Sequence, residues 1–103
     1  MSEATGSDRQ TPVIVDNPEA NQFEVHVAGH VAFVSYLRRG DTIFFTHTEV
    51  PKELEGRGLG SVLARGVLDR ARNEHWQVVA RCPFIAKYIE RHPEYQSLLR
   101  KGP

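Results

Sequence analysis

The sequence lacks three features that would each indicate a particular class of protein. Lysine and arginine together number 13, as do aspartate and glutamate, so no overall basic field favours nucleic acid or an anionic membrane as partner. Cysteine occurs once, at Cys82, which excludes an internal disulfide and is typical of a reducing compartment. No apolar run approaches the length of a membrane span. We therefore expect a cytoplasmic protein that binds neither nucleic acid nor membrane.

Length and composition indicate one small folded domain. The chain has 103 residues, of which 40% are hydrophobic and 25% charged, the balance of an ordinary globular protein. Residues 1–11 are polar and lack the apolar stretch of a signal peptide, so we interpret them as a disordered leader. Residues 12–103 form the expected domain.

The first half of this domain has the pattern of antiparallel strands. Residues 12–16 could form a short edge strand, and residues 23–27 alternate apolar with polar side chains. Residues 31–37 and 42–50 are rich in β-branched and aromatic side chains. Connections as short as those between them join antiparallel strands, which predicts a meander of three to four strands.

The second half predicts a helix, a strand and short C-terminal helices. Residues 59–72 carry an apolar stripe at helical spacing, formed by Leu59, Val62, Leu63, Gly66, Val67 and Ala71. Residues 76–82 form a compact strand, which the preceding helix would connect to the meander in parallel orientation with a right-handed crossover. Residues 84–91 and the segment after Pro93 have helical patterns. The expected fold is mixed α+β.

A glycine-rich turn connects the last strand of the meander to the helix. Gly56, Gly58 and Gly60 permit positive φ angles and close approach of a ligand. The first amides of the helix have no internal partner and lie at the positive end of its dipole, which favours a phosphate. A Walker loop would place lysine after its last glycine, and a Rossmann turn would follow the first strand of an alternating chain. Both are disfavoured, whereas a turn with glycines for chain reversal alone stays open.

This turn resembles the pyrophosphate loop of GNAT acetyltransferases. That loop consists of Arg or Gln, two residues, Gly, one residue and Gly or Ala, and residues 55–60 match it at both glycines, with Glu55 as the departure. Residues 45–51, 81–84 and 88–95 are similar to a short GNAT-like subfamily of acetyl-coenzyme A-binding proteins. The resemblance covers nearly all of residues 23–99.

The resemblance implies a GNAT-like fold in which the strands at residues 42–50 and 76–82 splay apart to admit pantetheine. It implies acetyl-coenzyme A as co-substrate, with a backbone N–H of Val50 or Glu49 bonded to the thioester carbonyl. The residues implied to bind the co-substrate are Glu49, Val50, Glu55, Gly56, Arg57, Gly58, Leu59, Gly60 and Ser61. The spacing of the five histidines matches no zinc signature, so no metal is expected.

Cys82 is one candidate for the chemistry of acetyl transfer. It ends a strand just before a proline, where GNAT proteins open toward the thioester, and its thiolate could accept the acetyl group. The alternative is a small buried residue on the strand face that it shares with Trp76, Val78 and Ala80.

Three further side chains could move protons. His47 and Glu49 alternate with Phe45, so all three should lie on one side of the strand unless a bulge intervenes, and either polar residue could be a general base. Tyr88 stands where many GNAT enzymes carry a tyrosine that protonates coenzyme A. Each could instead have an ordinary structural role, His47 and Glu49 as strand residues and Tyr88 in helix packing.

Two functions follow from these residues. The first is an acetyltransferase that acts on an unidentified acceptor, either an amine directly or through Cys82. The second is a non-catalytic acetyl-coenzyme A-binding module or a carrier acetylated on Cys82, because a chain this short has few elements left to build an acceptor pocket.

Overall fold

The computed structural model describes residues 13–100, and in its sheet each strand lies beside its neighbour in sequence. The strands are β1 (Val15–Asn17), β2 (Gln22–Val27), β3 (His30–Arg39), β4 (Thr42–Glu49) and β5 (Gln77–Ala80). The first four pair antiparallel, and β5 pairs parallel with β4. The predicted meander and parallel strand are confirmed. The expected leader at residues 1–11 lies outside the described residues.

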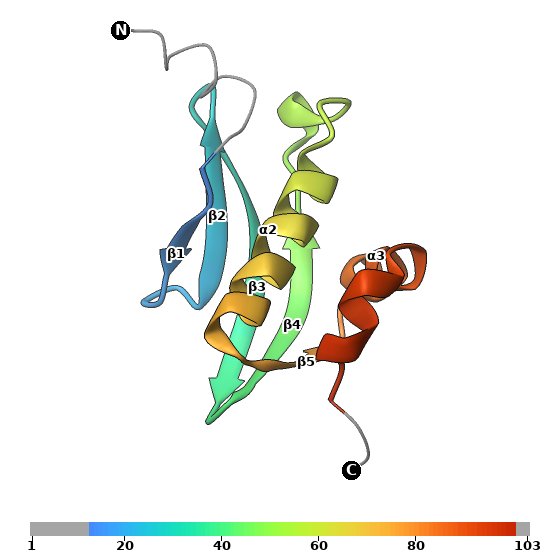
Figure 1. Cartoon of the computed structure of the whole chain (residues 1–103). Helices are drawn as coiled ribbons and strands as arrows, with labels where there is room; N and C mark the ends of the chain where they lie inside the picture. The colour runs from blue at the N-terminus through green and yellow to red at the C-terminus, as the bar shows by residue number, and fades with distance from the viewer. Residues whose placement is uncertain (1–12, 101–103) are drawn as a thin grey trace, which may run out of the picture.

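Helix α2 (Leu59–Glu74) connects β4 to β5 and lies across one face of the sheet (Figure 1). Most of its apolar stripe is buried, and so is the neighbouring Leu68, whereas Val62 and Gly66 are half-buried. The helix ends at His75, whose φ of 62° is left-handed and whose N–H bonds to the Ala71 and Arg72 carbonyls. The predicted helix therefore extends slightly further than its apolar pattern.

Three shorter helical segments complete the chain. They are η1 (Lys52–Leu54), α3 (Pro83–Arg91) and η2 (Pro93–Leu98), of which η1 and η2 are 3₁₀ helices. Pro83 and Pro93 occupy first-turn positions, where the missing N–H costs nothing. The Tyr95 hydroxyl on η2 donates to the Asp69 carboxylate on α2 at 2.7 Å, and burial together with this bond raises the pKa of Tyr95 to about 12.

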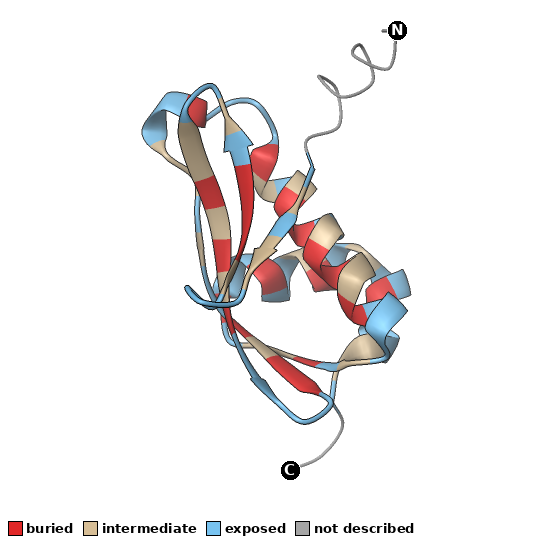
Figure 2. Cartoon of the chain, turned by 90° about the vertical axis from the view of Figure 1, so that its left-hand side faces the viewer, coloured by how far each residue is buried: buried red, intermediate tan, exposed pale blue. Residues whose placement is uncertain are grey.

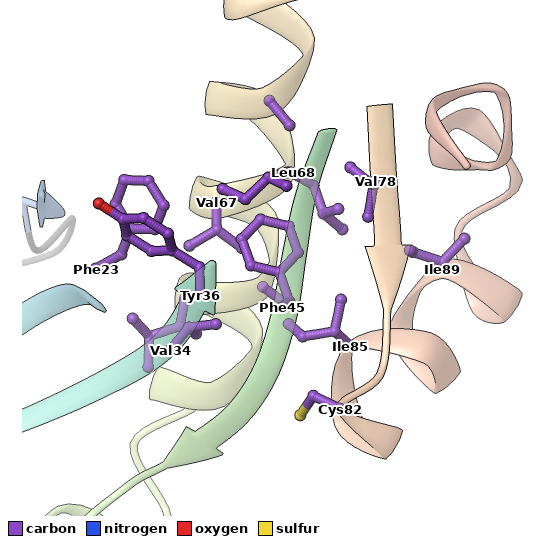
Figure 3. Packing of buried hydrophobic residues seen from close by; sticks show 14 of the residues in the cluster. Phe23, Val34, Tyr36, Phe45, Val67, Leu68, Val78, Cys82, Ile85 and Ile89 are labelled. Carbon is purple, nitrogen blue, oxygen red and sulfur yellow. The ribbon is translucent and has the colours of Figure 1, made fainter. Parts of the chain in front are cut away.

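The core lies between the sheet and the helices, which occupy one side of it (Figure 2). Figure 3 shows side chains from all parts of this layer meeting between β3, β4, β5, α2 and α3. On the opposite face of the sheet, Leu37 is 50% exposed. Within residues 13–100, no helix is both long and apolar enough to cross a bilayer.

A buried carboxylate joins the ends of β1 and β2. Glu24 is 8% exposed and accepts hydrogen bonds from the side-chain amides of Asn17 at 2.8 Å and Gln22 at 2.7 Å. Its other oxygen lies 2.8 Å from His26 Nε2. These bonds, that of Asn17 first, hold the pKa of Glu24 below its usual value.

We predict that Glu24→Gln lowers the free energy of unfolding at neutral pH but has little effect in acid. A carboxyl whose pKa is lowered on folding contributes stability above its unfolded pKa and loses it as pH falls through the folded value. The difference between wild type and variant should therefore shrink below pH 4.5. Urea unfolding at pH 7 and pH 3 measures this difference, and an equal loss at both pH values would contradict the assignment.

Candidate functional site

The pairing between β4 and β5 ends at a single carbonyl group. The parallel ladder runs from Thr42 and Gln77 to Phe45 and Ala80. The Phe45 carbonyl then accepts two amides, from Arg81 at 3.0 Å and Cys82 at 2.9 Å. Beyond this point β4 continues to Glu49, while the segment after β5 leads into α3. The predicted strand at residues 76–82 is thus shorter than expected, because its last two amides converge on one acceptor.

A β-bulge lies at the same level of β4. Tyr36 pairs with Phe45 and Ser35 with His47, so Thr46 is an extra residue in β4. This bulge is the exception under which Phe45, His47 and Glu49 need not share one side of the strand, and Phe45 is fully buried toward the helices. The inserted residue changes the alternation, so His47 and Glu49 lie on the opposite face.

His47 and Glu49 do form the expected pair. The distance between His47 Nε2 and Glu49 Oε1 is 3.1 Å, and both side chains are more than half exposed. Phe33, on the same face of β3, has its ring centre 6.2 Å from that of His47. The histidine and carboxylate are therefore accessible from the face of the sheet that the helices leave uncovered.

Cys82 lies on the other side of β4. It caps the N-terminus of α3, is 3% exposed, and packs with the core at the end of β5 (Figure 3). Its Sγ atom is 3.2 Å from the Thr48 hydroxyl. The structure does not bring Cys82 to His47 or Glu49, since the bulge directs Thr48 toward Cys82 and the two others away. The sequence analysis missed Thr48, for which a threonine in a strand gives no signal.

The glycine-rich turn leaves the first amides of α2 open. Gly56 and Gly58 have φ angles of 86° and 72°, so both positions use the left-handed region that favours glycine. Glu55 and Arg57 are exposed on either side of Gly56. Gly58 caps α2 without a side-chain hydrogen bond, no acid lies in the first turn, and the first helical bond is that of Val62 N–H to the Gly58 carbonyl. The amides before Val62 are thus available to an anion.

Gly60 is needed for a different reason. A Cβ atom at this position would lie 2.8 Å from the ring of Phe84, the second residue of α3. The absent side chain lets α3 pack against the start of α2, and the role of Gly60 in the approach of a ligand stays a prediction. The two helix N-termini are held together by this contact.

Tyr88 is a half-buried residue of α3 that packs against the core and lines a cavity with Ser61, at the start of α2. A cavity of about 130 Å³ is lined by Ser61, Phe84, Lys87, Tyr88, Arg91 and His92. The Tyr88 ring stacks on His92 with 3.9 Å between ring centres, and burial raises the pKa of its hydroxyl. The spacing of Phe84, Lys87, Tyr88 and Arg91 places them on one helical face, which sequence reasoning could have recognised. Ser61 and Tyr88, predicted from separate motifs, line one cavity.

Among residues 13–100, no group of three histidine, cysteine or carboxylate side chains is placed to hold a metal. The site that the described chain builds therefore consists of open helix amides, an interrupted strand ladder, and polar side chains on both sides of β4.

Comparisons with known proteins agree with this architecture. The family model described as GCN5-related N-acetyl-transferase matches residues 22–98. The chain is similar to Protein NATD1 of Mus musculus, with 39% identity over 89% of this chain and 87% of that protein, and to Protein NATD1 of Xenopus tropicalis, with 36% identity over 80% and 78%. The solution structure of a GCN5-like candidate N-acetyltransferase from Staphylococcus aureus superposes with a TM-score of 0.67 at 25% identity, covering 90% of this chain and 92% of that one.

The fold is that of an N-acetyltransferase domain. The chain belongs to the GCN5-related N-acetyltransferase family, whose members use acetyl-coenzyme A as co-substrate.

We predict that Cys82 reacts slowly with a bulky thiol reagent in the folded protein. A side chain that is 3% exposed and capped by the Thr48 hydroxyl is shielded from such a reagent. Thr48→Ala removes that cover and should raise the modification rate on the order of tenfold, in proportion to local access. The measurement is the rate of absorbance change with a chromogenic disulfide. A wild-type rate equal to that of the denatured chain would show that Cys82 is not shielded.

Proposed function

We propose that the protein transfers an acetyl group from acetyl-coenzyme A to an amine. The observation that carries this proposal is that the open α2 amides follow, after the short segment η1, the strand β4, which continues beyond its pairing with β5. The diphosphate of coenzyme A would bind at the glycine-rich turn, and the pantetheine arm attached to it would lie along β4. The residues proposed to hold the diphosphate are Gly56, Arg57, Gly58, Leu59, Gly60 and Ser61.

The register of β4 indicates which backbone groups face the pantetheine. The Tyr36 N–H bonds to Asn21 on the far side of β3, so Tyr36 and Phe45 are a pair without mutual hydrogen bonds. Thr48 and Val34 form the second pair after that one when the bulged residue is left out. They are therefore also a pair without mutual hydrogen bonds. The N–H of Thr48 is therefore directed away from β3, to the side where β5 has ended.

Alternation then assigns the remaining strand residues. Glu49 pairs with Phe33 and directs its amide toward β3, whereas Val50 follows with the orientation of Thr48. Of the two expected donors to the thioester carbonyl, we retain Val50 and add Thr48, and we assign Glu49 to the acceptor side through its carboxylate. The half-buried Val50 side chain packs against the core, which fixes the backbone at this point.

The chemistry requires one proton to leave the amine and one to reach the coenzyme A thiolate. In the proposed reaction the amine approaches from the face that carries His47 and Glu49, and its nitrogen forms a bond to the acetyl carbon as the carbon–sulfur bond breaks. His47 takes the proton of the amine, and Glu49, 3.1 Å away, stabilises the resulting imidazolium. Tyr88 stays protonated at neutral pH, since burial raises its pKa, and supplies a proton to the thiolate.

Direct transfer is favoured over an acetylated Cys82. A cysteine nucleophile is activated by a neighbouring base or cation, whereas the Cys82 thiol contacts the neutral Thr48 hydroxyl. Its Sγ atom is also buried against the core at the end of β5. We therefore propose that Cys82 helps to position Thr48 and α3.

The diphosphate site predicts that Gly58→Ala weakens binding of acetyl-coenzyme A, roughly ten- to hundredfold for the loss of a charge-assisted hydrogen bond. Gly40→Ala is the matched control, because Gly40 also has positive φ, at 60° against 72° for Gly58, and both have open space around the missing Cβ. Each substitution should cost about 1–2 kcal/mol of stability. Calorimetric titration of both folded variants measures affinity, and equal affinities would contradict a ligand at Gly58.

The proposed base predicts that His47→Gln lowers kcat about 10²–10⁴-fold without changing the affinity for acetyl-coenzyme A. His26→Gln is a matched control, since His26 is equally exposed, at 59%, and also contacts a glutamate on its own strand, at 2.8 Å. Release of coenzyme A thiol during turnover of a panel of amines gives the rate.

The same assay, with one further variant and a mass measurement, distinguishes direct transfer from a carrier acetylated on Cys82. Cys82→Ala should retain turnover, and intact mass spectrometry of wild type should show no acetyl adduct. Turnover that survives His47→Gln but disappears in Cys82→Ala, with a stable adduct on the wild type, would instead support acetylation of Cys82.

A further inference from the structure

A second cavity lies on the face of the sheet opposite the helices. It has a volume of about 240 Å³ and is lined by Leu37, Arg39, Phe44 and Arg81. The strand registers place all four on one face. Leu37 is paired with Phe44, Arg39 lies two residues after Leu37, and Arg81 lies two residues after Val79, the partner of Phe44. None of these residues takes part in the co-substrate site proposed above.

The lining combines two guanidinium groups with an apolar floor. Arg81 lies over the Phe44 ring with 5.1 Å between its Cζ atom and the ring centre, and Leu37 is 50% exposed. Among residues 13–100, neither Arg39 nor Arg81 forms an ion pair with a carboxylate. Arginine binds carboxylates through parallel hydrogen bonds, and the exposed leucine and phenylalanine suit a short hydrocarbon chain. A carboxylate on an apolar chain fits both features.

The cavity adjoins the place where the reaction is proposed. The Arg81 N–H bonds to the Phe45 carbonyl at the end of the ladder, so the Arg81 side chain leaves the backbone at the point where β4 loses its partner. His47 lies on the same face, three residues after Phe44, of which one is the bulged Thr46. At about 3.3 Å per strand residue, Phe44, on the cavity lining, and His47, the proposed base, are separated by roughly 7 Å along β4.

We propose that Arg39 and Arg81 bind the carboxylate of the acetyl acceptor, which makes the acceptor a molecule that carries an amine and a carboxylate roughly 7 Å apart. This inference rests on the proposed acetyl transfer for the role of the amine, but the carboxylate site is testable without turnover. Arg39 and Arg81 position the acceptor and take no part in proton transfer.

The binding experiment uses hexanoate, with hexanamide as its neutral counterpart. In ¹⁵N NMR titrations of the whole chain, hexanoate should shift the amide signals of Leu37, Phe44 and Arg81. Hexanamide should bind about tenfold or more weakly, because it cannot form charge-assisted hydrogen bonds with both arginines. The double variant Arg39→Gln/Arg81→Gln should lose the preference for hexanoate. Arg70→Gln, which removes one charge from α2 on the other side of the sheet, should keep it.

The kinetic experiment compares 5-aminopentanoate and 6-aminohexanoate with their amides as acceptors. We expect the carboxylates to have about tenfold or greater kcat/KM, and the double variant to lose this preference while its affinity for acetyl-coenzyme A is unchanged. Turnover without preference for the carboxylates, or equal binding of hexanoate and hexanamide, would overturn the carboxylate site alone. Absence of acetyl-coenzyme A binding would overturn the proposed function, and the NMR titration would still decide whether the arginine cavity binds a carboxylate.

Discussion

The arrangement of this domain depends on one carbonyl group. The Phe45 oxygen accepts both the Arg81 and the Cys82 amide. The backbone hydrogen bonding between β4 and the segment after β5 therefore ends at this oxygen, immediately after the ladder. The extra residue Thr46 follows Phe45 directly in β4, so the added twist of the bulge and the loss of pairing with β5 occur at the same place. As a result β4 presents unpaired backbone on one edge and a different set of side chains on each face.

The bulge assigns these side chains to their roles. An uninterrupted strand would direct Phe45, His47 and Glu49 to one face, burying the imidazole with the phenylalanine or exposing the phenylalanine with the imidazole. With one residue inserted, Phe45 fills the core, His47 and Glu49 reach solvent, and Thr48 meets Cys82. A single added residue thus separates a buried side and an exposed side within one short strand.

The sequence was sufficient for features that depend on local chemistry. Alternation, turns and the apolar stripe predicted the strands and α2, and the left-handed Gly56 and Gly58 were recognisable because few other residues adopt such angles. The bulge was not predictable in position, since it results from the register between β3 and β4 and Thr46 carries no mark of it. Contacts between distant segments were equally hidden: Gly60 was predicted from its motif, and its contact with the Phe84 ring is visible only once α3 is placed.

In the proposed reaction, the two faces of β4 receive different substrates. The helices occupy one side of the sheet, where open amides and the Tyr88 cavity suit an anionic, nucleotide-like ligand. On the other side of the sheet, which also carries the arginine cavity, His47 and Glu49 are more than half exposed. In the proposed reaction the two sides connect at the edge of β4 beyond Phe45, where no strand among residues 13–100 pairs with it. The sheet itself would then separate the co-substrate, on the side of α2 and α3, from the acceptor on the other side.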